Sequence, residues 1–161
     1  MSYFPQRKSP RLQGFDYTSD GAYFVTIYAH QRLHLFGEIA DGEMRRSAAG
    51  DITINCWSAI PEHYADVTID AFVAMPNHVH GVLFLHGDKG NFRTSLGRVI
   101  NAYKGAVTAR IRQAEDSEVV VWQGRYHDHI IRNEMELSLL RDYIENNPTR
   151  WAEDQFNGSD S

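Results

Sequence analysis

The sequence has very little of what marks several large protein classes. It contains a single cysteine, Cys56, so an intramolecular disulfide is impossible, which fits a reducing compartment. No apolar run approaches the roughly 18 residues that a membrane-spanning helix needs. The basic start of the chain, residues 1–14, also lacks the apolar segment of a secretory signal. We therefore expect a soluble protein of the cytoplasm.

Several enzyme motifs are missing as well. There is no glycine-rich phosphate loop of the P-loop or Rossmann type, no paired-cysteine zinc motif and no G-x-S-x-G element. What is present is a chain of 161 residues, 42% hydrophobic and 23% charged, which is enough for one packed core. The sequence predicts a single domain over residues 15–151, preceded by a flexible basic arm, 1–14, and followed by an acidic tail, 152–161.

Positive charge is scarce overall but concentrated in one segment. The 16 basic and 21 acidic residues give a net charge of -5, which predicts no general attraction to nucleic acid. Nevertheless, every charged residue within 92–112 is basic, whereas most charged residues within 38–70 are acidic. The ordinary interpretation of such a basic segment is a solvated helix face. A local basic surface on an acidic protein is therefore expected.

Hydrophobic periodicity gives the expected elements. The β-branched and aromatic pattern predicts a hairpin of the strands 23–29 and 35–39, followed by the turn Asp41-Gly42, and a central strand pair around Pro76-Asn77. The expected strands are 23–29, 35–39, 69–75, 78–85 and 119–122, and the expected helices are 48–64, 95–114 and 134–146. The order β-β-α-β-β-α-β-α predicts an α+β fold, a ferredoxin-like antiparallel sheet with helices packed mainly on one face.

Two histidines form the first candidate site. His78 and His80 are two residues apart in an expected strand, so both side chains point to the same face. Such a pair can hold one divalent metal ion if a third ligand arrives from another element. An H-x-H pair alone is a weak signal, because satisfied or surface histidines produce the same pattern.

The last expected helix offers partners for that pair. Tyr143 and Asn147 are four residues apart, so they share one helix face. The structural alternative is that Tyr143 continues an apolar stripe with Met135 and Leu139, and that Asn147 ends the helix before a proline.

Two other tyrosines compete as nucleophiles. Tyr103 lies on the basic helix, and Tyr126 lies beside His127 and His129, which alternate with Asp128. That polar cluster is compatible with a second metal site or with a substrate-contacting loop.

Three blocks in this order, MPNHVHGVLFL, WQGRYHDHIIRN and LRDYIENNPTRW, strongly resemble the REP-associated tyrosine transposases, relatives of the single-tyrosine HUH transposases. The resemblance spans about residues 23–151. It implies a ferredoxin-like fold with the metal-binding histidines His78 and His80 on a central strand, Tyr143 as nucleophile and Asn147 as the polar third ligand. The implied activity is metal-dependent cleavage and rejoining of single-stranded DNA through a 5′-phosphotyrosine.

The resemblance also implies a cofactor and partners. Mg²⁺ or Mn²⁺ is the expected ion, although two imidazoles by themselves suit Mn²⁺ or Zn²⁺ better. The expected partner is a single-stranded DNA hairpin of the repetitive extragenic palindrome type, bound by a nucleoid-associated monomer or homodimer. The candidate DNA contacts are Arg7, Lys8, Arg11, Arg93, Arg98, Lys104, Arg110, Arg112, Arg125 and Arg132.

Other functions stay open at this level. A hairpin-binding regulator of the same fold would retain recognition without cleavage. A metalloprotein acting on a small molecule would use His78, His80 and the histidines at 127 and 129 but would not need Tyr143. A structural adaptor is favoured only by the acidic surface.

Overall fold

The structure is a computed structural model that describes residues 21–86 and 94–153. The expected basic arm 1–14 and residues 154–161 of the expected acidic tail lie outside the described residues. None of the helices in the described part of the chain combines the length and the apolar composition that a bilayer crossing requires.

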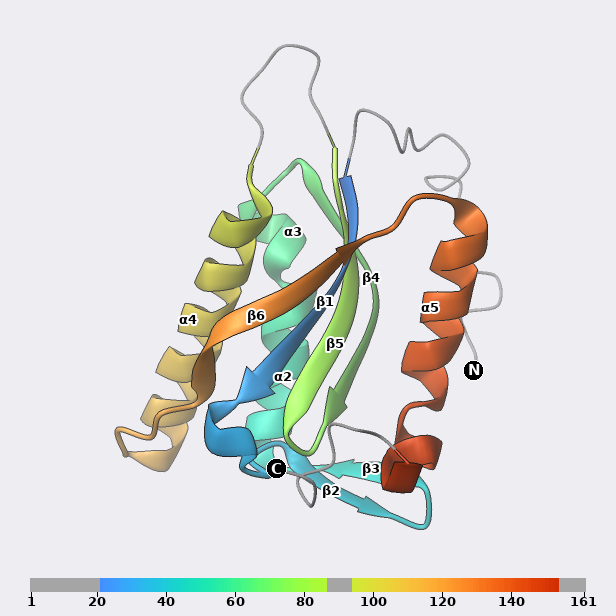
Figure 1. Ribbon diagram of the computed structural model, residues 1–161. Helices are drawn as coiled ribbons and strands as arrows, with labels where there is room; N and C mark the ends of the chain where they lie inside the picture. The colour runs from blue at the N-terminus through green and yellow to red at the C-terminus, as the bar shows by residue number, and fades with distance from the viewer. Residues whose placement is uncertain (1–20, 87–93, 154–161) are drawn as a thin grey trace.

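A four-stranded antiparallel sheet forms the centre of the molecule (Figure 1). Its strands, in spatial order, are β4 (Val67–Met75), β5 (His78–Leu85), β1 (Gly21–Ala29) and β6 (Trp122–Ile130). The first half of the chain contributes β1 and β4, and the second half contributes β5 and β6, each pair with a helix between its strands. The halves interleave, so that β1 and β5 are the interior strands. This is the ferredoxin-like α+β arrangement that the sequence predicts.

Helices cover both faces of the sheet unequally. One face carries α2 (Ala48–Ser58), α3 (Ile60–His63) and α4 (Leu96–Glu115), and the other carries α5 (Glu134–Asn146) and the short η3 (Pro148–Glu153) (Figure 1). The larger core lies under α2 and α4, where Trp57 and Tyr103 pack against strand residues. The prediction that helices pack mainly on one face is therefore confirmed.

The expected pairing of segments 23–29 and 35–39 is wrong. The short strands β2 (Gly37–Ala40) and β3 (Glu43–Arg46) pair with each other around Asp41-Gly42, in a separate two-stranded sheet. Both edges of β1 are already occupied by β5 and β6, so β1 has no free edge to offer. The chain leaves β1 through the short η2 (His30–Arg32) instead.

The final strand also differs from the expectation of 119–122. β6 begins at Trp122 and runs through the polar sequence up to Ile130. Among the described strands it pairs only with β1, and most of its residues are exposed. The apolar alternation that identifies a buried strand is therefore absent. The expected helix 48–64 is similarly divided, because α2 ends at Ser58 and α3 follows after Ala59.

A β-bulge in β4 helps to attach α5 to the sheet. Between Ile69 and Phe72, β4 has one residue more than β5, so both Asp70 and Ala71 face α5. Ala71 packs in the second apolar cluster, which also contains Val82, Leu137 and Ile144. Asp70 accepts two hydrogen bonds from the guanidinium of Arg141, the first from Nε at 2.8 Å.

Gly81 is required for packing on the opposite face. A Cβ there would lie 2.5 Å from the ring of the buried Trp57. We expect Gly81→Ala to lower the free energy of unfolding by about 1–3 kcal/mol, because the indole has little room to move. Gly105 on α4 has nothing within 4 Å of such a Cβ. Gly105→Ala should instead raise stability by up to about 1 kcal/mol through helix propensity. Urea unfolding of both variants checks this, and equal effects would contradict it.

Candidate functional site

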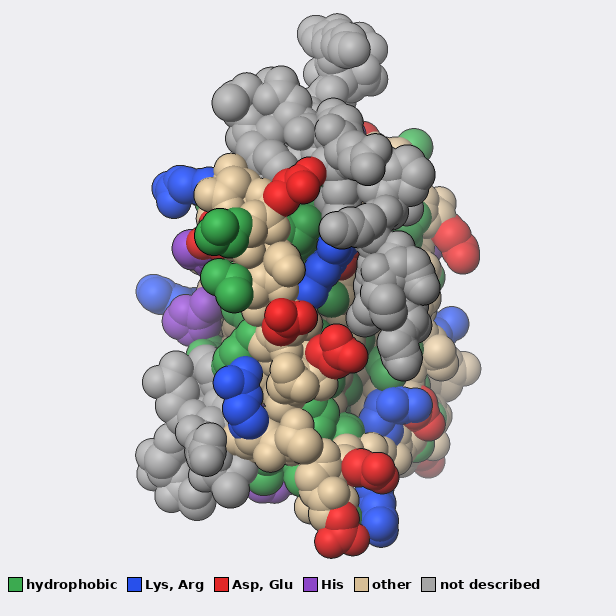
Figure 2. All heavy atoms as spheres, turned by 90° about the vertical axis from the view of Figure 1, so that its right-hand side faces the viewer, with side chains coloured by type: hydrophobic (Ala, Val, Ile, Leu, Met, Phe, Trp, Pro, Cys, Tyr) green, Lys and Arg blue, Asp and Glu red, His purple; other side chains and the backbone are tan. Residues whose placement is uncertain are grey.

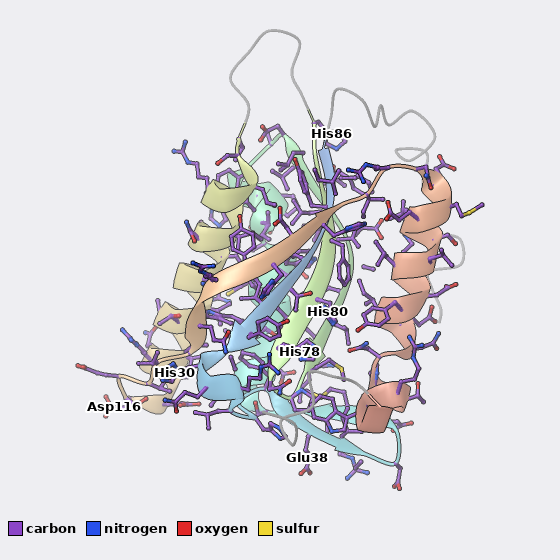
Figure 3. The ribbon with its side chains drawn as sticks, viewed as in Figure 1. His30, Glu38, His78, His80, His86 and Asp116 are labelled. Atoms are coloured by element: carbon purple, nitrogen blue, oxygen red, sulfur yellow. The ribbon has the colours of Figure 1, made fainter. Side chains whose placement is uncertain are left out.

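His78 and His80 lie on the interior strand β5, on the face turned toward α5 (Figure 3). They are essentially inaccessible to solvent, with exposed fractions of 0% and 1%. Their Nε2 atoms face each other at 3.2 Å. His86, in contrast, lies at the far end of β5 and bonds Thr68. Because side chains alternate between the two faces of a strand, the two imidazoles point to the same place, as the sequence predicts.

The outer nitrogen of each ring is held by a neighbour. His78 Nδ1 donates to Asn77 Oδ1 at 2.7 Å, since a carbonyl oxygen can only accept, and this leaves the lone pair of His78 on Nε2. His80 Nδ1 bonds Thr26 Oγ1 at 2.8 Å. A threonine hydroxyl can donate or accept, so Thr26 supports either tautomer of His80. Orienting contacts of this kind are typical of metal-binding histidines.

Burial keeps both rings neutral. Desolvation is the main cause that holds the pKa of His78 well below its usual value, and the charges of His80 and Arg32 act in the same direction. Desolvation likewise lowers the pKa of His80 to about 3. When His80 carries its proton on Nδ1, where Thr26 can accept it, both Nε2 lone pairs are free, and the two neutral imidazoles are a suitable donor set for a cation.

Helix α5 places Tyr143 beside this pair. The helix begins after Asn133, whose side chain accepts a hydrogen bond from Glu136 N, and its inner residues pack on the sheet. The ring centroid of Tyr143 is 5.4 Å from that of His80 and 6.1 Å from that of Phe24. The structure therefore joins a strand-borne histidine pair to a helix-borne tyrosine.

Asn147 follows one turn later and reaches the same place. It is 2% exposed, and its Oδ1 is buried without a hydrogen bond of ordinary geometry to any described residue. A long hydrogen-bonding contact from its side chain to His78 raises the pKa of that ring, against the larger lowering by burial. A buried amide oxygen with an open lone pair beside two neutral imidazoles is what a metal ion in this position would need.

The donor set fits a single cation. The two Nε2 atoms, 3.2 Å apart, are close enough together to bind one cation between them. Among the described residues no group of three or more His, Cys, Asp or Glu side chains is placed to hold a metal. The third protein ligand would therefore be the amide oxygen of Asn147, and further positions would be left for substrate or water.

The basic helix is not brought to this site. α4 carries the candidate DNA contacts Arg98, Lys104, Arg110 and Arg112 on the opposite face of the sheet from α5 (Figure 1). Lys104 Nζ donates to Gln123 O and Arg112 Nε to Val119 O, so these two stabilise the chain that enters β6. The other candidates Arg7, Lys8, Arg11 and Arg93 lie outside the described residues.

The polar cluster after Tyr126 is a strand and not a loop. His127 and His129 point toward the α5 side, where His127 contacts Tyr28 and His129 bonds Glu136 on α5. Asp128 points to the other side, so the three do not converge on one ion. The exposed Arg125 lies on this strand, and Arg132 lies in the connection to α5.

The competing tyrosines are remote from the histidine pair. Tyr103 is buried in the α2–α4 core and donates to Thr53 O at 3.0 Å, and burial raises its pKa well above the usual value. Tyr126 packs against the same core, next to Gly97 of α4. Both lie across the sheet from Tyr143.

Sequence reasoning missed several residues that surround the site. Besides Phe24, Thr26 and Asn77, they are Arg150, whose guanidinium lies 5.4 Å above the ring of Tyr143, and Trp151, which stacks on His78 at 6.5 Å. Asn77 and Trp151 are within the motif blocks, whereas Phe24 and Thr26 come from β1 and are revealed only by strand pairing.

We expect the stability of the metal-free protein to fall on acidification from about pH 7.5 to about pH 5.5. An unfolded histidine takes up a proton near its usual pKa of 6.5, whereas buried His80 does not until about pH 3. Stability that is present above pH 6.5 is therefore lost as the pH falls toward 3. Between pH 7.5 and pH 5.5 the loss from His80 is about 1 kcal/mol, and His78 adds in the same direction. Urea titrations with chelator measure this, and His80→Asn should flatten the dependence. A flat wild-type profile would contradict neutral burial.

Comparisons with known proteins bear on the family and the fold of the chain. Residues 46–147 match the family model described as "Transposase IS200 like". An uncharacterized protein of Haemophilus influenzae is 35% identical, over 93% of this chain and 92% of that protein. Among solved structures, the chain is similar to a REP-associated tyrosine transposase bound to a REP hairpin, with a TM-score of 0.55, 20% identity and coverage of 81% of this chain and 67% of that one.

A second solved structure, a Deinococcus radiodurans R1 protein assigned as a transposase, is similar with a TM-score of 0.53 and 18% identity. The match covers 83% of this chain and 93% of that one. At these identities the two structures support the fold, and the family model supports the family. Together they confirm the resemblance that the three sequence blocks indicate, and the chain belongs to the IS200-like transposase family.

Proposed function

We propose that this protein is a divalent-metal-dependent single-stranded DNA endonuclease and transesterase, which cuts and rejoins hairpin-flanked DNA with Tyr143 as nucleophile. The observation that carries the proposal is the position of Tyr143, 5.4 Å from His80 between ring centroids, on a helix that crosses the face of β5. Membership of the transposase family supports DNA as the substrate.

The metal site of the proposal consists of His78, His80 and Asn147. Mg²⁺ or Mn²⁺ bound there would supply positive charge that polarises the scissile phosphate and offsets the charge that builds on its oxygens. The protein contributes neutral, buried ring nitrogens and a buried amide oxygen without a hydrogen bond of ordinary geometry. Thr26 and Asn77 keep the two rings turned toward the ion position.

The reaction assigned to Tyr143 is an in-line displacement. The phenol loses its proton to solvent, Oη bonds the phosphorus, and the bond from phosphorus to the 3′ oxygen breaks. The 3′ oxygen takes up a proton, so the products are a free 3′-hydroxyl and a 5′-phosphotyrosine. Because one phosphodiester replaces another, the reverse attack by a 3′-hydroxyl rejoins DNA without an external energy source.

Hairpin DNA is the proposed partner because one structural neighbour is bound to a REP hairpin. The protein cannot rely on overall charge for this, since its net charge is -5. Figure 2 shows acidic and basic side chains mixed on the α5 side of the molecule. Binding must therefore depend on a few well-placed cations near the site.

Covalent capture tests the proposal. We expect the protein to form an adduct with an end-labelled single-stranded hairpin oligonucleotide in Mn²⁺ or Mg²⁺, stable on a denaturing gel. Tyr143→Phe removes the nucleophile and should abolish the adduct, as should a chelator. Tyr126→Phe is the matched control and should leave the adduct unchanged, because that tyrosine lies across the sheet. A tight complex without any adduct would instead favour a hairpin-binding regulator.

Asn147→Leu tests the third ligand separately from catalysis. The substitution removes the buried Oδ1 while keeping an apolar side chain of similar size, so unfolding stability should be maintained. Mn²⁺ affinity, measured by titration calorimetry without DNA, should fall about tenfold or more. Unchanged affinity would exclude Asn147 as a ligand.

A further inference from the structure

Arg32 lies beside the candidate metal site and has no acidic partner among the residues that the structure describes. It follows β1, and its guanidinium carbon is 4.9 Å from the ring centroid of Tyr28, which in turn lies 6.2 Å from the ring of His78. Arg32 is half-buried, and no Asp or Glu in the described part of the chain forms an ion pair with it. Its charge reaches His78, where it helps to hold the pKa of that ring low.

The backbone that carries Arg32 is strained. Gln31 and Arg32 have φ values of 53° and 54°, in the left-handed region that residues other than glycine seldom adopt. Two such residues in succession are unfavourable, and they turn the chain so that the Arg32 side chain lies over Tyr28. Strain of this kind occurs where the position of a side chain matters for function.

Arg150 offers a second guanidinium at the same site. It lies on η3, three residues after Asn147, and its guanidinium carbon is 5.4 Å from the ring centroid of Tyr143. Arg150 also has no ion pair with a described Asp or Glu. The two arginines thus come from different segments and border the histidine pair and the tyrosine.

We propose that Arg32 and Arg150 form a phosphate clamp, which binds the single-stranded DNA backbone on the two sides of the scissile phosphate. The inference rests on the proposed function, because it takes Tyr143 and the histidine pair as the point where the strand is cut. Guanidinium groups suit this role, since they present several donors in a plane that matches phosphate oxygens. The half-buried setting of Arg32 strengthens such a contact relative to one in open solvent.

The test measures DNA binding without chemistry. Variants are made in the Tyr143→Phe chain, and the affinity for a fluorescent DNA hairpin with a single-stranded tail is followed by anisotropy in chelator, over a series of KCl concentrations. Arg32→Gly removes the guanidinium and places at this position the residue that best tolerates positive φ. Its melting temperature should therefore be unchanged or higher, which separates binding from folding.

The clamp predicts that Arg32→Gly and Arg150→Ala each weaken binding about fivefold or more and reduce the slope of log affinity against log salt by about 0.7. Arg32→Lys keeps the charge and should restore most of that slope. Arg46→Ala is the charge-matched control, because Arg46 bonds Asp51 at the start of α2, on the other side of the sheet. It should leave affinity nearly unchanged.

Two results would overturn the clamp: Arg32→Gly binding DNA like Arg46→Ala, or Arg32→Gly losing thermal stability while keeping the full salt slope. In a parallel assay in Mn²⁺, adduct formation is measured for the chain that keeps Tyr143. If that chain forms an adduct and the arginine variants bind normally, the clamp fails and the proposed function stands. If no adduct forms but the arginine variants lose binding, the cleavage proposal fails, and the two arginines still bind the DNA backbone beside the histidine pair.

Discussion

The ion pair between Arg141 on α5 and Asp70 on β4 joins the tyrosine-bearing helix to the sheet. It is bidentate, and its side chains are only 14% and 16% exposed, so it is stronger than an ordinary surface pair. The bulge in β4 makes it possible, because it leaves both Asp70 and its apolar neighbour Ala71 facing the helix. Tyr143 lies two residues beyond Arg141, so its distance from the histidines depends on this attachment.

The site combines groups that would be unfavourable separately. Two imidazoles are buried in an interior strand without charge, and Asn147 keeps an unsatisfied oxygen against them. Buried polar atoms of this kind lower stability unless a ligand satisfies them. Arg32 adds a strained backbone and a cation at the border. The α2–α4 face of the same sheet is mainly an apolar core, although the indole nitrogen of Trp57 is also buried there without a hydrogen bond to a described residue.

The sequence predicted elements well where hydrophobic pattern reflects burial. The strand that carries His78 and His80 and the helix that carries Tyr143 were placed at the observed positions. The strand is a mostly apolar run that is buried along its whole length, and the helix repeats apolar residues at helical spacing. Prediction failed for β6, since an edge strand with exposed polar residues has no apolar alternation. It also failed for the expected pairing of β2 with β1. β5 and β6, which come later in the chain, occupy both edges of β1, and only the tertiary structure shows this.

By itself, the sequence determined the local chemistry: strand alternation brings His78 and His80 to one face, and helical spacing puts Tyr143 and Asn147 one turn apart. Which face of the sheet each helix covers was decided only by the tertiary structure. α4 and α5 have similar amphipathic patterns, yet α5 lies over the histidines and α4 carries its basic residues on the opposite face. Arg32 and Arg150 likewise reach the site through chain reversals after β1 and α5, and sequence spacing does not encode where such reversals meet.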